Sequence, residues 1–143
     1  MKRLFVFALT ALSLPAFAAF EPLQAGPAAS GAPVEIFINK DSVKKDDNLE
    51  LVWAMFAFKI PQREKSQPSL TFQSATARLA FNCKEHTYAL RAEKHYEGEK
   101  RQGKVIYDYV VPADKVVFAP VQPGTSSAAE EAIACTAPAK KSE

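Results

Sequence analysis

Apolar and polar residues alternate along most of the chain after residue 33, as they do in β-strands that bury one face. The strongest run is 49–60, LELVWAMFAFKI, in which both faces are apolar. One face carries Leu49, Leu51, Trp53, Met55 and Ala57, and the other carries Val52, Ala54, Phe56, Phe58 and Ile60. A helix is the alternative, but aromatic and β-branched residues favour a strand. The pattern therefore predicts a central strand, covered on both faces, with Trp53 at least half buried.

Shorter alternating runs predict further strands on either side of this one. They occupy 34–39, 69–83, 85–96, 104–111 and 116–118. The run that ends at Cys83 changes parity near Ser74, which predicts a bulge or a break there. The polar segments between the runs are predicted to be turns, at 40–42, 44–48 and 97–103.

One helix is predicted near the C-terminus. Ser127 and Glu130 have the spacing of a capping box, in which two side chains satisfy each other's backbone donors. The helix would cover 128–136, with Ile133 facing inward, and Pro138 would end it. Together these elements predict an α+β fold, an antiparallel β-sheet of about five to six strands with a C-terminal helix.

The predicted helix is too short to cover the sheet. About nine residues give roughly 13 Å at 1.5 Å per residue, enough for part of one face. The second apolar face of 49–60 is therefore expected to meet a partner, either as a homodimer or through a hydrophobic groove that binds a partner. A sheet that curls over its own second face is the alternative.

The first 18 residues have the organisation of a secretory signal peptide. Lys2 and Arg3 precede an apolar run at 4–14, and small residues follow, so cleavage is predicted between Ala18 and Ala19. The run is about 11 residues long, against the roughly 20 that a membrane-spanning helix needs. No cysteine lies near the cut to receive a lipid. The protein is therefore expected in the periplasm or outside the cell, without a membrane span.

The rest of the chain divides into three parts. Residues 19–33 are rich in Pro, Gly and Ala and are predicted to be a flexible linker, 34–137 a single domain, and 138–143 a solvated tail. The whole chain has 18 Lys+Arg and 16 Asp+Glu, and Lys2 and Arg3 account for the difference. The mature chain would be near neutral, which disfavours a nucleic-acid partner because such partners bind clustered cations.

Cys83 and Cys135 are the two cysteines of the chain. An even number in an exported protein predicts a disulfide, which would tie the C-terminal helix to the strand that ends at Cys83. Two buried free thiols are the alternative. A metal site is disfavoured because neither cysteine belongs to a CxxC pair.

No enzyme motif is present in the sequence. It contains no GxSxG, no HExxH and no Gly-rich phosphate loop, so no catalytic residue, cofactor or metal is expected. His86 and His95 lie nine residues apart on one predicted strand and therefore on opposite faces, unless a bulge intervenes. His86 is interpreted as a packed residue at the core edge, and His95 as a surface residue. Lys100 and Arg101 lie in a turn with two glutamates, which makes a mixed-charge turn rather than a basic patch.

Short motifs spaced along 34–137 resemble those of a known domain family. They are Asp41-Ser42-Val43, Leu51-Val52-Trp53, the strand 74–83, Tyr88-Ala89-Leu90-Arg91, the Gly-turn 98–103, and Pro123-Gly124-Thr125-Ser126 running to Cys135. In these motifs the chain resembles the surface-adhesin protein E-like domain of Gram-negative bacteria. The resemblance implies a small α+β domain with a disulfide-tied helix, an extracytoplasmic location, dimerisation, and host-matrix binding in the adhesin members.

Two features decide between two functions. The chain has no lipid-attachment cysteine, and the strand into Cys83 carries only Arg78 as a basic residue, whereas a matrix ligand would favour an exposed basic cluster. We therefore expect a secreted, non-enzymatic binding module of the periplasm or cell envelope with a protein partner. The alternative is an outer-surface adhesin that binds host matrix proteins.

Overall fold

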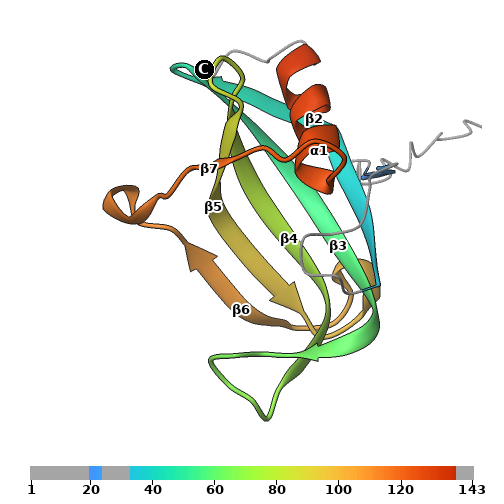
Figure 1. Ribbon diagram of the computed structural model, residues 1–143. Helices are drawn as coiled ribbons and strands as arrows, with labels where there is room; N and C mark the ends of the chain where they lie inside the picture. The colour runs from blue at the N-terminus through green and yellow to red at the C-terminus, as the bar shows by residue number, and fades with distance from the viewer. Residues whose placement is uncertain (1–19, 24–32, 138–143) are drawn as a thin grey trace, which may run out of the picture.

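The computed structural model describes residues 20–23 and 33–137, which form a seven-stranded antiparallel sheet and one α-helix (Figure 1). The strands are β1 (Glu21–Pro22), β2 (Val34–Asp46), β3 (Leu49–Arg63), β4 (Thr71–Asn82), β5 (Thr87–Tyr96), β6 (Val105–Val110) and β7 (Ala119–Pro120). Two short 3-10 turns, η1 (Glu99–Arg101) and η2 (Ala113–Lys115), flank β6, and helix α1 spans Ser126–Thr136. The predicted α+β fold is confirmed, and the two-residue strand β1 is the one strand beyond the six predicted runs.

Strand β3 is central, as predicted. The sheet order is β1-β2-β3-β4-β5-β6, so β3 pairs with β2 on one side and β4 on the other, while β7 pairs with β5. Residues of both parities are buried, for example Leu51 and Val52. Trp53 is more than half buried, which confirms that part of the prediction as well.

The main core lies between α1 and one face of the sheet, at the end of the sheet that α1 crosses (Figure 1). Its buried members are Ile38, Val43, Val52, Ala54, Ala77, Leu79, Phe81 and Ala134. Cys83 and Cys135 form a disulfide beside this core, with their Cα atoms 5.8 Å apart. The disulfide ties α1 to the end of β4, so a helix of 11 residues is held on the sheet by a covalent bond as well as by packing.

The turns predicted at 40–42 and 44–48 are largely absent, because β2 continues through them as an irregular strand. Side chains replace the missing ladder bonds. The Asp41 N–H donates to the Asn39 side-chain oxygen, and the Ser42 hydroxyl donates to the Asn39 carbonyl and accepts from the Trp53 N–H. A tight turn at 47–48 then leads into β3.

The irregularity predicted near Ser74 is present in the β3–β4 ladder, but the additional residues belong to β3, between Ala57 and Gln62. Pro61 lies in this segment and has no N–H to donate to the ladder. The position predicted for the last strand, 116–118, is wrong by a few residues, since the strand that pairs with β5 is Ala119–Pro120.

Helix α1 does not begin with the predicted capping box. It starts at Ser126, and the N-cap is Thr125, whose backbone is extended. Glu130 therefore lies two residues beyond the N3 position from which it could bond the N-cap backbone, and its side chain is buried instead, 3% exposed.

A bulge in β5 changes which residues face the core. Leu79 pairs with Leu90 but Arg78 pairs with Ala92, so Arg91 is the extra residue. Beyond the bulge, residues 93 and 95 lie on the same face as the core leucines, and residue 92 lies on the opposite face. The prediction that His95 is a surface residue is therefore wrong: His95 is 9% exposed.

Three sequence expectations fall wholly or partly on the rest of the chain. The cleavage between Ala18 and Ala19 and the tail 138–143 lie outside the described residues. Within the predicted linker 19–33, Glu21–Pro22 pair with β2 as strand β1, and Leu23 packs against the core.

Candidate functional site

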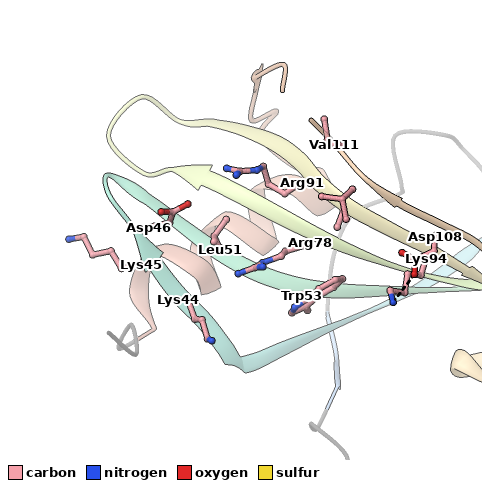
Figure 2. A pocket seen from close by; sticks show the side chains of 12 residues that line it. Lys44, Lys45, Asp46, Leu51, Trp53, Arg78, Arg91, Lys94, Asp108 and Val111 are labelled. Carbon is pink, nitrogen blue, oxygen red and sulfur yellow. Dashed lines mark ion pairs between the residues drawn. The ribbon is translucent and has the colours of Figure 1, made fainter. Parts of the chain in front are cut away.

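The face of the sheet opposite α1 carries a groove with a volume of about 640 Å³ (Figure 2). It is lined by Lys44, Lys45, Asp46, Leu51, Trp53, Arg78, Arg91, Ala92, Lys94, Asp108, Val110 and Val111. These residues come from strands β2 to β6 and the segment just after β6. The volume falls in the range of ligand pockets, roughly 300–1,000 Å³.

The floor of the groove follows from the strand register. Trp53 pairs with Arg78, Arg78 with Ala92, and Ala92 with Val110, so these four residues form one row across β3 to β6. Residues in such a row project from the same face, with neighbouring Cβ atoms about 4.5–5.5 Å apart. The side chains of Trp53 and Arg78 are therefore neighbours on this face of the sheet.

The groove is cationic. Its lining contains five cationic side chains and two carboxylates, an excess of three positive charges. Lys94 Nζ lies 3.0 Å from Asp108 Oδ2, and this hydrogen-bonded ion pair raises the pKa of Lys94. Among the residues that the structure describes, Arg78 and Arg91 make no ion pair.

Arg78 and Arg91 are the two cations best placed to bind a ligand. They extend in the same direction from the neighbouring strands β4 and β5 (Figure 2), and both are partly buried. An arginine offers a planar fork of donors that matches a carboxylate or a phosphate. The groove is therefore suited to binding an anion.

Sequence reasoning found parts of this site but not the site itself. The sequence identifies Arg78 as the only basic residue of its strand, and strict alternation along 85–96 places Arg91 on the solvated face with Glu93 and His95. The bulge moves Arg91 out of that set, and it lines the groove beside Ala92. The remaining cations come from β2 and β5, so no single segment of the sequence looks basic.

A second cavity, of about 670 Å³, lies on the α1 side of the sheet beyond the helix. Phe56, Phe58, Phe72 and Tyr107 supply aromatic walls around His95. His95 Nδ1 contacts Glu64 Oε2, and His95 Nε2 lies 2.7 Å from Glu93 Oε1. The ring of His95 also stacks on Phe72, with centroids 4.0 Å apart.

The ion pairs around His95 act against the effect of burial. Burial alone lowers the pKa of His95, but the hydrogen bonds to Glu93 and Glu64 outweigh it and raise that pKa. Burial likewise raises the pKa of Glu64, and the bonds from His95 and Ser66 outweigh it, so that pKa is lowered. This cluster fastens the loop after β3 to β5. No group of three or more His, Cys, Asp or Glu side chains that could hold a metal ion occurs within 20–23 and 33–137.

The remaining residues named in the sequence analysis, His86, Lys100 and Arg101, make contacts within the fold. His86 lies in an exposed turn before β5, 3.1 Å from Glu131 of α1, so its interpretation as a packed core-edge residue is wrong. Lys100 lies over the ring of Phe37 and Arg101 over the ring of Phe20. Both cations thus hold the η1 turn against the N-terminal strands.

Comparison with known proteins gives the family of this chain. The surface-adhesin protein E family matches residues 24–136, most of the sequence. The chain belongs to this family. The resemblance seen in the short motifs is thereby confirmed, and membership makes the chain an adhesin-type surface protein. No curated protein sequence matches the chain.

Solved structures of Haemophilus influenzae protein E share the fold. One structure of that protein is 14% identical, with a TM-score of 0.57 over 81% of this chain and 83% of the other. Another, of protein E from non-typeable Haemophilus influenzae, is 14% identical, with a TM-score of 0.55 over 85% and 79%. At this identity the likeness concerns the fold alone. Within the described part of the adhesin E chain, no helix has the length and apolarity needed to cross a membrane.

Proposed function

We propose that this adhesin E chain is a non-enzymatic binding protein of the cell envelope, and that the cationic groove is its contact surface for a partner. The observation that carries the proposal is the pair Arg78 and Arg91, which make no ion pair among the described residues and line the same groove as the indole of Trp53. A groove of this chemistry on the sheet face that α1 leaves uncovered is suited to a negatively charged protein surface.

Export of the chain is part of the proposal. The charged start, the apolar run and the small residues before Ala19 support cleavage by a signal peptidase and a location in the periplasm or outside the cell. The disulfide between Cys83 and Cys135 fits an oxidising compartment.

An outer-surface adhesin that binds host matrix proteins is the second candidate. A specific observation favours it: the groove supplies the exposed cationic cluster that no single strand of the sequence shows. Protease treatment of intact cells separates the two locations, because a surface-displayed protein is digested and a periplasmic one is not.

The binding role is tested with a charge-reversed groove. We compare the mature protein with the double variant Arg78→Glu and Arg91→Glu and with a control, Lys59→Glu and Lys115→Glu, which reverses two exposed lysines outside the groove. Each protein is immobilised and exposed to an envelope extract and to purified matrix proteins. The wild type and the control should retain the same partner, and the groove variant should lose it. Equal retention by all three proteins would contradict the assignment of the groove.

A further inference from the structure

We infer that the groove binds an acidic polypeptide segment in an extended conformation, with an apolar side chain seated on Trp53 and carboxylates on Arg78 and Arg91. This inference rests on the proposed function, which names the groove but not the chemistry of its ligand. It follows from the mixed character of the lining.

The apolar part of the lining distinguishes the ligand class. Besides Trp53, the apolar lining consists of Val110, which is 70% accessible, the partly buried Ala92 and Val111, and the buried Leu51. A sulfated polysaccharide or a nucleic-acid backbone satisfies cations but has no aliphatic side chain for these residues. A polypeptide can carry both carboxylates and an apolar anchor, and aromatic or aliphatic anchors in a pocket typically dominate the affinity of protein interfaces.

The spacing of the groove suits an extended chain. From β3 to β6 the row Trp53, Arg78, Ala92, Val110 spans three strand intervals, roughly 14 Å at about 4.8 Å per interval, which is the length of four to five extended residues. In an extended segment the side chains of residues i and i+2 project to the same side, roughly 6.6 Å apart. A carboxylate two positions from an anchor on Trp53 therefore reaches the guanidinium group of the adjacent Arg78.

The two carboxylates of the groove repel a bound acidic segment only weakly at the two arginines. Asp108 is already paired with Lys94, and Asp46 lies at the other end, next to Lys44 and Lys45 in sequence. The two arginines without a described ion pair lie between these ends. A ligand with a small number of carboxylates near its anchor thus fits better than a uniform polyanion, which would also meet Asp46 and Asp108.

The test uses defined probes and the fluorescence of Trp53, which is the only tryptophan of the chain. The probes are a capped peptide of four glutamates around a central phenylalanine, the same peptide with alanine at the centre, a lysine version with phenylalanine, and a heparin octasaccharide. The acidic phenylalanine peptide should change the Trp53 emission saturably, and the lysine peptide should not. The alanine peptide should bind at least about fivefold more weakly than the phenylalanine peptide, since truncating one buried anchor costs on the order of 1 kcal/mol or more of binding free energy.

The variant Arg78→Glu and Arg91→Glu should bind the acidic phenylalanine peptide with at least about tenfold lower affinity. Two groups that make charge-assisted hydrogen bonds are replaced by groups with the same charge as the peptide. Circular dichroism and an intact disulfide verify its fold. Should the double variant not fold, Arg91→Ala at the bulge gives the same comparison, with a smaller loss expected.

Two outcomes would overturn the inference without removing the proposed function. One is tight heparin binding with no difference between the phenylalanine and alanine peptides. The other is no peptide binding while partner capture still depends on Arg78 and Arg91. If partner capture is itself unaffected by the charge reversal, the proposed function of the groove fails instead.

Discussion

At the scale of single residues, His95 is the most informative side chain. Each of its ring nitrogens faces a carboxylate, Glu64 on one side and Glu93 on the other. A nitrogen that faces a carboxylate must carry a proton to make a favourable contact, so the arrangement selects the doubly protonated imidazolium. Glu64 also accepts bonds from the Ser66 backbone and hydroxyl, so the ion pairs hold the loop after β3.

His95 should make stability depend on pH in a defined direction. Its pKa is raised in the folded protein, so its contribution is complete below pH 6.5 and is lost as the pH rises through the raised value. His95→Gln should lower the free energy of unfolding by about 1–3 kcal/mol at pH 6, and by less at pH 9. Urea unfolding across this range measures the effect, with His86→Gln as the exposed control. Parallel pH profiles for wild type and His95→Gln would contradict the ion-paired arrangement.

The sequence could not assign His95 correctly, and the reason is local. Strict alternation along 85–96 places it with Arg91 and Glu93 on the solvated face. One extra residue at Arg91 separates these side chains, because a bulge shifts the face of everything that follows. A bulge depends on the fit between two paired strands, so the alternation of apolar and polar residues within one strand does not predict it.

At the scale of elements, helix α1 carries an unusual buried carboxyl group. Glu130 is 3% exposed, and its Oε1 finds no hydrogen-bond partner among the described residues. Burial raises the pKa of Glu130 to about 7. The predicted capping box would have bonded this side chain to the helix start, but that prediction is wrong because the helix begins at Ser126, before the predicted start.

Glu130 should destabilise α1 packing at alkaline pH. Its folded pKa lies above its unfolded value of 4.5, so stability falls as the pH rises from 4.5 to about 7, by roughly 3 kcal/mol. Glu130→Gln removes this dependence, so the variant should be the more stable protein at pH 8, with the advantage shrinking toward pH 5. Thermal unfolding at both pH values, with exposed Glu85→Gln as the control, measures it. A variant less stable than wild type at pH 8 would refute this description of Glu130.

The disulfide is the second feature that belongs to an element, because it fixes α1 to the end of β4. It closes a loop between residues separated by 52 positions, which corresponds to about 4 kcal/mol of stabilisation in the chain-entropy estimate. Replacing Cys83 and Cys135 together by alanine should lower the free energy of unfolding by about this amount. Guanidinium unfolding of the variant, and of the wild type under reducing conditions, should agree. A loss well below 1 kcal/mol in both experiments would contradict the stapling role.

At the scale of the whole molecule, the sequence predicts the architecture better than the site. Periodicity is local, so β3, its central place and the C-terminal helix could all be predicted from residues close in sequence. The groove could not, because Lys44, Arg78, Arg91 and Lys94 come from three strands and meet only through the register. The short motifs that carry the family resemblance contain Leu51, Trp53, Arg78 and Arg91, but the sequence does not show that these residues meet in one groove.

The second face of β3, opposite α1, has two parts. Over part of it, the η1 turn folds back: the Ser74 hydroxyl donates to the Gly98 carbonyl and accepts from the Arg101 N–H, while Lys100 lies over Phe37. The rest of the face is the groove. The sequence interpretation expected a hydrophobic groove or a homodimer here, with a curled sheet as the alternative. The groove in the structure has a cationic lining instead, and a turn rather than a curled sheet lies over the other part of the face.

The homodimer stays a prediction. Exposed apolar residues lie on and after the edge strand β6, where Val105 is 48% and Val117 is 78% accessible. Such an edge favours pairing with another chain. Sedimentation at micromolar concentration should give a dimer for the wild type and a monomer for the variant Val105→Lys and Val117→Lys. A monomeric wild type at that concentration would contradict the prediction.

The most direct test of the central claim asks which surface touches the natural partner. A photo-crosslinking amino acid replaces Val110 in the groove or, as the matched control, exposed Ala132 on α1 at the opposite face. Each protein is produced in cells, irradiated, and examined for covalent adducts with envelope or matrix proteins. If the groove binds the partner, position 110 should give a covalent adduct and position 132 should give none. The adduct from position 110 should disappear in the variant Arg78→Glu and Arg91→Glu. An adduct from position 132 alone, or one that persists in the charge-reversed protein, would contradict that claim.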